Sequence, residues 1–160
     1  TLRSLLDSNI KAVGVFVNES IDTVNSIATS CKLDIVQLHG EETPLFCSQV
    51  IVPVWKALSI SSRSDIRMHR TYPNAAGILL DTFARGEKGG TGKTFNWSLA
   101  KGISKEKFTI LAGGLTSDNV HMAIQALKPH IVDVSSGVEV EGCKDKNKIQ
   151  QFIRRVREYE

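Results

Sequence analysis

The stretch that decides the fold is Ile78-Leu79-Leu80-Asp81-Thr82, and the glycine-rich segment Gly86-Glu87-Lys88-Gly89-Gly90-Thr91-Gly92-Lys93-Thr94 follows it closely. An apolar run of this kind is typical of a parallel strand buried on both faces, here ending in a carboxylate. Two later segments repeat the plan and end in small residues that expose backbone N–H groups: Thr109-Ile110-Leu111-Ala112-Gly113-Gly114 and Ile131-Val132-Asp133-Val134-Ser135-Ser136-Gly137. An acid at one strand end can transfer a proton, and two such turns beside it can bind a phosphate group. The combination favours an enzyme that acts on a phosphorylated substrate.

Similar apolar runs recur along the whole chain and alternate with helical patterns. They are continuous rather than alternating in polarity, as expected for strands covered by helices on both faces. They begin roughly 20–30 residues apart, which is the length of one βα unit in a barrel. The alternation predicts a parallel α/β sheet, either doubly wound or closed into a barrel, and periodicity does not separate the two. The expected strands are residues 12–17, 34–38, 54–58, 77–81, 109–112 and 131–134.

The helical patterns between these strands carry plausible cap residues. Thr116 or Ser117 is expected to cap the helix before the sixth strand, and an amphipathic stripe that includes Ile149 predicts the last helix. A short helix is expected within residues 61–74. No linker or low-complexity segment divides the sequence, so we expect one domain over residues 1–160.

The composition excludes several classes of protein. The 160 residues are 41% hydrophobic and 23% charged, with a net charge of +3, so we expect neither a nucleic-acid partner nor a membrane partner. The three cysteines have no metal-ligand spacing and predict free thiols in a reducing, cytoplasmic compartment, with no metal. Cys31 and Cys47 are expected to pack within helices, and Cys143 lies past the last expected strand.

Asp81 and the two later turns are the first candidate site residues. Ligands bind at the carboxyl ends of parallel strands, where Asp81 lies, although a loop aspartate that caps a turn would look the same. Two neighbouring turns can hold a phosphate through backbone N–H groups alone. Tight turns also use glycine for positive φ, and that reading stays open. The candidate phosphate-binding residues are Gly113, Gly114, Ser135, Ser136 and Gly137.

Three polar residues in or beside apolar strands are further pocket candidates. Asp133 is expected to point inward near the carboxyl end of its strand, and Lys56 stands between apolar neighbours. Because buried charges need partners, these two residues suggest an interior ionic network. His39 follows its strand directly and either lines the pocket or bonds a nearby carbonyl.

The segment Gly89-Gly90-Thr91-Gly92-Lys93-Thr94 suggests a nucleotide-binding P-loop only superficially. Glu87 occupies the position where that motif requires a glycine, and its carboxylate would repel the phosphates. A mobile loop over residues 85–92 beside the site is the better interpretation.

The ordered set of segments resembles phosphoribosylanthranilate isomerase, a (β/α)8 TIM-barrel family. The resemblance covers almost the whole chain and implies that strands 3–8 are present, from the end of helix 2 to helix 8. It rests on Val13-Gly14-Val15-Phe16-Val17-Asn18, Val36-Gln37-Leu38-His39-Gly40, Leu79-Leu80-Asp81, Gly89-Gly90-Thr91-Gly92, Leu111-Ala112-Gly113-Gly114-Leu115 and Val132-Asp133-Val134-Ser135-Ser136-Gly137-Val138-Glu139.

This resemblance implies an Amadori rearrangement of N-(5'-phosphoribosyl)anthranilate to 1-(2-carboxyphenylamino)-1-deoxyribulose 5-phosphate in tryptophan biosynthesis. Asp81 matches the general acid that opens the ribose ring, and a cysteine base then removes the C2' proton. The resemblance implies a small phosphorylated substrate and no cofactor. It leaves open whether the protein is a monomer or a homodimer.

Two expected features of the family are missing from the 160 residues. The sequence has no Lys-x-Cys-Gly motif, which carries the base, and no matching arginine for the anthranilate carboxylate. We therefore expect a fragment that is inactive and poorly folded by itself. Two alternatives remain open: a non-catalytic remnant that binds phosphorylated ligands, and another phosphate-binding barrel enzyme.

Overall fold

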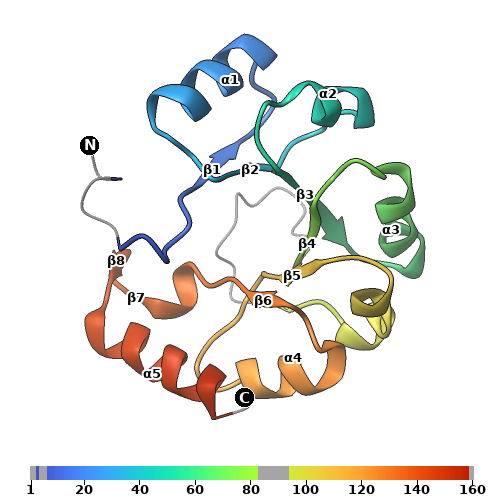
Figure 1. Ribbon diagram of the computed structural model, residues 1–160. Coiled ribbons are helices and arrows are strands. Elements are labelled where there is room, and N and C mark those ends of the chain that lie inside the picture. The colour runs from blue at the N-terminus through green and yellow to red at the C-terminus, as the bar shows by residue number, and fades with distance from the viewer. Residues whose placement is uncertain (1–2, 4–6, 83–93, 159–160) are drawn as a thin grey trace. The chain divides into compact units, whose positions relative to one another are not determined.

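The computed structural model describes residue 3, residues 7–82 and residues 94–158 of the chain. Strands and helices alternate along it, as Figure 1 shows. The strands are β1 Val13–Phe16, β2 Ile35–Leu38, β3 Val54–Ile60, β4 Gly77–Thr82, β5 Thr109–Leu111, β6 Ile131–Val132, β7 Glu139–Val140 and β8 Cys143–Lys144. The α-helices are α1 Ile21–Ser30, α2 Pro44–Gln49, α3 Arg63–Arg67, α4 Val120–Leu127 and α5 Lys146–Arg157. Short 3-10 turns are η2 Met68–Thr71, η3 Trp97–Ala100, η4 Ile103–Lys105 and η5 Ser136–Val138.

The first six strands form one sheet in chain order, β1-β2-β3-β4-β5-β6. The pairs β1 with β2, β2 with β3, and β5 with β6 are parallel. All six predicted strands are therefore confirmed, with ends that shift by one or two residues. Parallel neighbours in chain order, joined by segments that carry helices, confirm the α/β class and the barrel-type arrangement of strands.

Contacts between Cα atoms divide the chain into two compact units. The first comprises Thr1–Leu58 with Met68–Ile78, and the second comprises Ser59–Arg67 with Leu79–Glu160. The boundary passes through β3 and β4 instead of following a linker.

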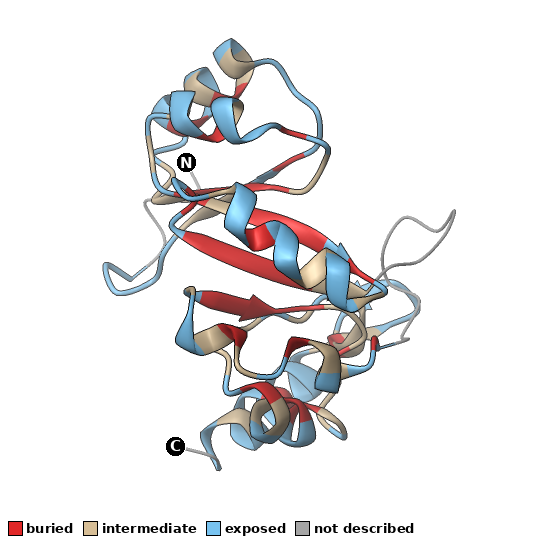
Figure 2. Cartoon of the chain, turned by 90° about the vertical axis from the view of Figure 1, so that its right-hand side faces the viewer, coloured by how far each residue is buried: buried red, intermediate tan, exposed pale blue. Residues whose placement is uncertain are grey.

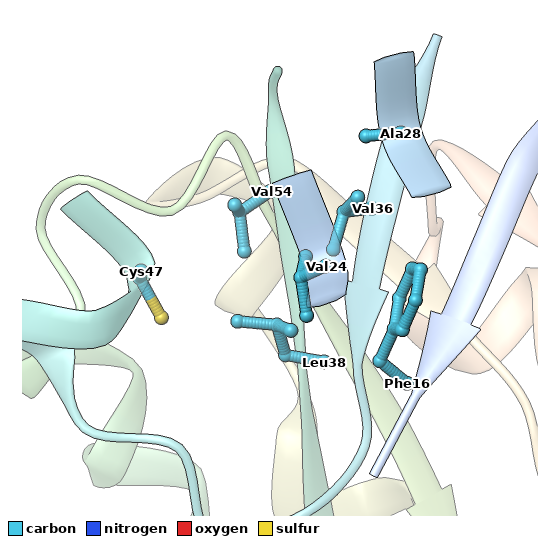
Figure 3. Close-up of a cluster of buried hydrophobic side chains, with 7 residues drawn as sticks. All are labelled: Phe16, Val24, Ala28, Val36, Leu38, Cys47 and Val54. Carbon is cyan, nitrogen blue, oxygen red and sulfur yellow. The ribbon is translucent and has the colours of Figure 1, made fainter. Parts of the chain in front are cut away.

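The core of the first unit lies between helices and strands β1 to β3. Figure 3 shows its seven buried side chains, which come from β1, α1, β2, α2 and β3. Helix α1 begins where it does because the Ser20 hydroxyl accepts a hydrogen bond from the Thr23 backbone N–H at 3.1 Å. Its buried residues, Val24 and Ala28, lie four positions apart and so share the face that packs on the strands. The cluster is Phe16, Val24, Ala28, Val36, Leu38, Cys47 and Val54.

Strand β5 and the part of β4 in the second unit carry its most deeply buried residues. Leu79, Leu80, Ile110 and Leu111 are 0% exposed, which explains why these runs read as continuous apolar stretches. Figure 2 shows the burial concentrated on the strands and on one side of the helices. Burying one such side chain stabilises the folded protein by about 1.5–3 kcal/mol. The residues at the ends of these strands are therefore held by a well-packed core.

Two features of the second unit differ from the prediction. Helix α4 begins at Val120 with Asn119 as its N-cap, and neither Thr116 nor Ser117 occupies that position. The β7–β8 hairpin was not predicted, because its strands are only two residues long. Its turn uses Gly142 at φ +78°.

Candidate active site

Asp81 lies at the carboxyl end of β4, as predicted. Its Oδ1 atom accepts a hydrogen bond from the Thr82 backbone N–H at 2.7 Å, and the side chain is half-buried. The neighbouring strand is fixed by the Ala112 N–H, which donates to the Leu80 carbonyl at 2.8 Å. The carboxylate is therefore held at the strand end while part of it faces solvent.

Gly113 packs directly against this strand end. It has φ +78°, and a Cβ at this position would collide with Asp81 Oδ1 and lie 2.5 Å from Thr82 N and 2.6 Å from Thr82 Oγ1. Side chains rarely adopt that backbone conformation, and no space exists for one. Glycine at 113 thus allows the turn after β5 to touch the end of β4.

A side-chain clamp shapes the same turn. Gly114 also has positive φ, at +66°. Asn119 turns back toward it: its Nδ2 donates to the Gly114 carbonyl at 2.9 Å, and its Oδ1 accepts from the Thr116 N–H at 2.9 Å. These two hydrogen bonds could not be predicted from the sequence, because the segment resembles an ordinary helix start.

Gly137 joins the turn after β6 to the turn after β5. A Cβ on Gly137 would collide with the Leu115 carbonyl oxygen and lie 3.1 Å from Val134 Cγ2. Together with Gly113, this contact brings Asp81 and the two glycine-containing turns to one edge of the second unit. The structure therefore confirms that they lie together, while their roles toward a ligand stay predictions.

Lys144 is a cation beside the second turn that sequence reasoning missed. Its Nζ lies 3.0 Å from Ser135 Oγ and 2.6 Å from Glu139 Oε1. The β7–β8 hairpin produces this arrangement, because it pairs Glu139 with Lys144 across two short strands. Ser135 itself is exposed, and Ser136 begins η5.

The expectation that Asp133 points into the interior is wrong. Strand β6 ends at Val132, so Asp133 lies just past it and is exposed instead of pointing into the interior. Its backbone N–H donates to the Leu111 carbonyl at 2.8 Å. Lys56 is buried as predicted, but its anionic partner is Glu42, at 3.2 Å.

Glu42 was missed because Glu41-Glu42 looks like a solvated pair of charges. The signal that could have found it is Lys56, since a buried cation requires a buried anion nearby. Burial alone would raise the pKa of the Glu42 carboxyl. The Asn18 backbone N–H, other hydrogen bonds and the Lys56 charge outweigh that effect, so the pKa lies below its ordinary value.

His39 follows β2 and is half-buried in the first unit. Its backbone N–H donates to the Phe16 carbonyl at 2.8 Å. Its Nδ1 lies 3.1 Å from Nε2 of the buried Gln37 side chain.

Cysteines offer no nucleophile at the Asp81 strand end. Cys47 is buried in α2, and burial raises the pKa of its thiol, while Cys31 and Cys143 are exposed. Cys31 is the C-cap residue of α1 and is exposed, so the expectation that it packs within a helix is wrong. Among residues 7–82 and 94–158, no group of three or more His, Cys, Asp or Glu side chains could hold a metal ion. The expected loop at residues 85–92 lies outside the described residues.

None of the described helices is long and apolar enough to span a bilayer. Parallel strands in chain order, with an acid and glycine turns at their carboxyl ends, define an α/β protein of the barrel class. The chain belongs to the N-(5'phosphoribosyl)anthranilate (PRA) isomerase family, whose model matches residues 3–155.

Individual relatives agree with the family match. A PRA isomerase of Thermoanaerobacter pseudethanolicus is 45% identical over 157 residues, which cover 98% of this chain and 77% of that protein. The crystal structure of the Thermotoga maritima enzyme superposes with a TM-score of 0.89 at 39% identity, covering 97% of this chain and 77% of that one. A third structure, with a TM-score of 0.81 at 35% identity, covers 96% of this chain and 74% of its own and contains reduced 1-(o-carboxyphenylamino)-1-deoxyribulose 5-phosphate.

Proposed function

We propose that this chain carries the proton donor and the phosphate site of a PRA isomerase, which rearranges N-(5'-phosphoribosyl)anthranilate in tryptophan biosynthesis. The observation that carries the proposal is the packing of Gly113 against Asp81 and of Gly137 against Leu115. It puts a carboxyl group and two turns with backbone N–H donors at one edge of the sheet, where a barrel enzyme binds its ligand.

Asp81 acts as the general acid in this proposal. In its protonated form it gives a proton to the furanose ring oxygen, the bond from that oxygen to C1' breaks, and the anilino nitrogen supplies the electron pair for a Schiff base. A base then removes the C2' proton, and the enolamine tautomerises to the ketone. The atoms balance as an isomerisation, and no cofactor is required.

The substrate phosphate binds to the backbone N–H groups of the two turns. Gly113 and Gly114 supply one set, and Ser135, Ser136 and Gly137 supply the other. Oriented amide groups favour an anion without needing a fixed cation. Lys144 Nζ donates to Ser135 Oγ at the same turn, while its charge is paired with the Glu139 carboxylate. Asp133, just past β6, is a further candidate residue in the second unit, and His39 of the first unit stays a separate prediction.

The general base is not among the cysteines of these 160 residues. No Lys-x-Cys-Gly motif occurs, and the three cysteines lie at the C-cap of α1, in α2 and in β8. We therefore expect the 160-residue polypeptide to bind ligand and open the ribose ring but not to complete the rearrangement. Free thiols support a reducing, cytoplasmic location for this chemistry.

Calorimetric titration with the reduced carboxyphenylamino-deoxyribulose phosphate tests the ligand site. We expect saturable binding that inorganic phosphate competes away, and we expect Gly137→Ala to weaken it by about 10-fold or more, since an added group at a packed site displaces the turn. Absence of binding to the unaltered chain, or binding that phosphate does not affect, contradicts the proposal.

Reductive trapping tests the acid separately from the missing base. Cyanoborohydride reduces the ring-opened Schiff base, and mass spectrometry detects the product as substrate plus two hydrogens. We expect the chain to accelerate trapping over protein-free solution, and Asp81→Asn to remove about 10²-fold or more of that acceleration. Asp22→Asn, an exposed change on α1, is the matched control. Equal acceleration by the Asp81 variant would exclude the acid role.

A further inference from the structure

The turn after β5 contains two consecutive glycines, and both have positive φ. Gly113 has φ +78° and Gly114 has φ +66°. Glycine populates positive φ about as readily as negative φ, so these two residues do not hold the conformation by themselves. Contacts from outside the glycine pair therefore select it.

Asn119 supplies such contacts through both ends of its side-chain amide. Its Nδ2 donates to the Gly114 carbonyl at 2.9 Å, and its Oδ1 accepts from the Thr116 N–H at 2.9 Å. Asn119 is the N-cap residue of α4, yet its side chain makes no capping hydrogen bond to that helix. An N-cap asparagine ordinarily accepts from an N–H two or three residues later. The side chain of Asn119 is thus committed to the turn and not to the helix.

The bond from Asn119 to Gly114 fixes the orientation of a whole peptide group. The Gly114 carbonyl and the N–H of the next residue belong to one planar unit, so a held carbonyl prevents that unit from turning over. A peptide that turned over would exchange the directions of its carbonyl and its N–H. This matters for an anion, because an N–H group attracts it while a carbonyl oxygen repels it.

The N–H groups of the glycine pair are available to such an anion. Within residues 7–82 and 94–158, neither the Gly113 N–H nor the Gly114 N–H donates a hydrogen bond to the protein. Gly113 also packs against Asp81 Oδ1, and all of these residues belong to the second unit. We propose that Asn119 is a positioning residue that holds the Gly113–Gly114 turn in the orientation that binds the substrate phosphate, an inference that rests on the function proposed above.

Asn25 on α1 provides a matched control for Asn119. Its Nδ2 donates to the Gln49 carbonyl at 3.1 Å, and its Oδ1 accepts from the Ile51 N–H at 3.1 Å. The same residue type therefore makes the same two kinds of bond in the first unit, to backbone that has no role in the proposed site. The test compares Asn119→Ala with Asn25→Ala, after circular dichroism has confirmed that each variant is folded.

A second variant serves if Asn119→Ala does not fold. Asn119→Asp combined with Asp118→Asn exchanges two neighbouring residues, so the net charge of the segment does not change. An aspartate at 119 can still accept from the Thr116 N–H but can no longer donate to the Gly114 carbonyl. This variant therefore removes the bond on which the inference depends and retains the other one.

Two measurements separate positioning from general stability. Hydrogen exchange of the Thr116 amide should rise in Asn119→Ala, and that of the Ile51 amide in Asn25→Ala, each by about 2- to 10-fold for one lost hydrogen bond. Inorganic phosphate should shift the Gly113 and Gly114 amide resonances of the unaltered chain. Affinity for phosphate and for the reduced carboxyphenylamino-deoxyribulose phosphate should fall by about 10-fold in Asn119→Ala and stay unchanged in Asn25→Ala.

Three outcomes would overturn the inference while leaving the proposed function intact. The first is unchanged Thr116 exchange in Asn119→Ala, and the second is undiminished phosphate affinity in that variant or in the exchanged pair. The third is an equal loss of affinity in Asn25→Ala, because a general loss of stability would then explain both. If the unaltered chain binds neither phosphate nor the analogue, the proposed function is refuted and the inference falls with it.

Discussion

Gly113→Ala should damage both stability and ligand binding, because glycine at this position does two things at once. The backbone has φ +78°, and the added methyl group would collide with Asp81 Oδ1 and lie 2.5 Å from Thr82 N. The methyl group meets the end of strand β4, where backbone cannot swing away as a flexible side chain would. Either the turn after β5 or the Asp81 end of β4 must move.

The magnitude follows from two separate terms. A left-handed conformation costs an L-residue about 1–2 kcal/mol. Overpacking a filled site costs about 1–3 kcal/mol more, so we expect a total of about 2–5 kcal/mol. Gly142 and Gly102 isolate the first term, since their φ angles are +78° and +92° and a Cβ on either would meet nothing within 4 Å. Alanine at either control position should cost only about 1–2 kcal/mol.

Urea denaturation of the three alanine variants measures these costs, and titration with the reduced carboxyphenylamino-deoxyribulose phosphate measures binding. Gly113→Ala should lose more stability than either control, and its affinity should fall by about 10-fold or more, as one lost anchoring hydrogen bond would predict. If Gly113→Ala and Gly142→Ala lose equal stability and bind the analogue equally well, the turn does not pack on Asp81 and the reasoning about the site is wrong.

Three further predictions concern pH, thiol chemistry and a helix cap. The pKa of the Glu42 carboxyl is lowered in the folded state from an ordinary 4.5. Its contribution to stability is therefore present above that value and is lost as the pH falls through the folded pKa. Urea midpoints measured from about pH 6 to about pH 3 should decline less in Glu42→Gln than in the unaltered chain. Burial raises the pKa of the Cys47 thiol, so alkylation followed by mass spectrometry should label Cys31 and Cys143 first and Cys47 only when the protein unfolds. Asp145 caps α5 by accepting from the backbone N–H three residues later, at 2.8 Å, so Asp145→Ala should lower the unfolding free energy by about 0.5–2 kcal/mol while Asp145→Asn retains most of it.

The strands could be predicted from sequence because their signal is local. Each is a short apolar run with helical patterns around it, and strands such as β4 are buried on both faces, so burial and composition agree. The β7–β8 hairpin could not be predicted in the same way. Its strands have two residues each, and Glu139 and Lys144 pair through charge and a left-handed turn instead of apolar alternation.

The acid and the turns could be predicted as a group, but the ion pair could not. Asp81 and Gly113 each follow a recognisable strand, and the ends of parallel strands meet by rule. Lys56 was found for its apolar neighbours, but its partner depends on how the loop after β2 folds back over β3. Nothing within a few residues of Glu42 records that long-range contact, so the sequence suggested Asp133 instead.

Glycine in these two turns had two interpretations, positive φ in a tight turn and exposure of backbone N–H groups to a phosphate. The structure shows that one does not exclude the other. Gly113 has positive φ, which is the ordinary reason for glycine in a tight turn, and it is also sterically enclosed. Gly137 is not among the residues with positive φ, yet a Cβ there would collide with the Leu115 carbonyl oxygen. Conformation alone therefore does not explain Gly137, and close approach does. Two turns can present N–H groups to the same small anion only if their backbones lie this close, so the lack of a side chain at 137 is a condition for the proposed phosphate site.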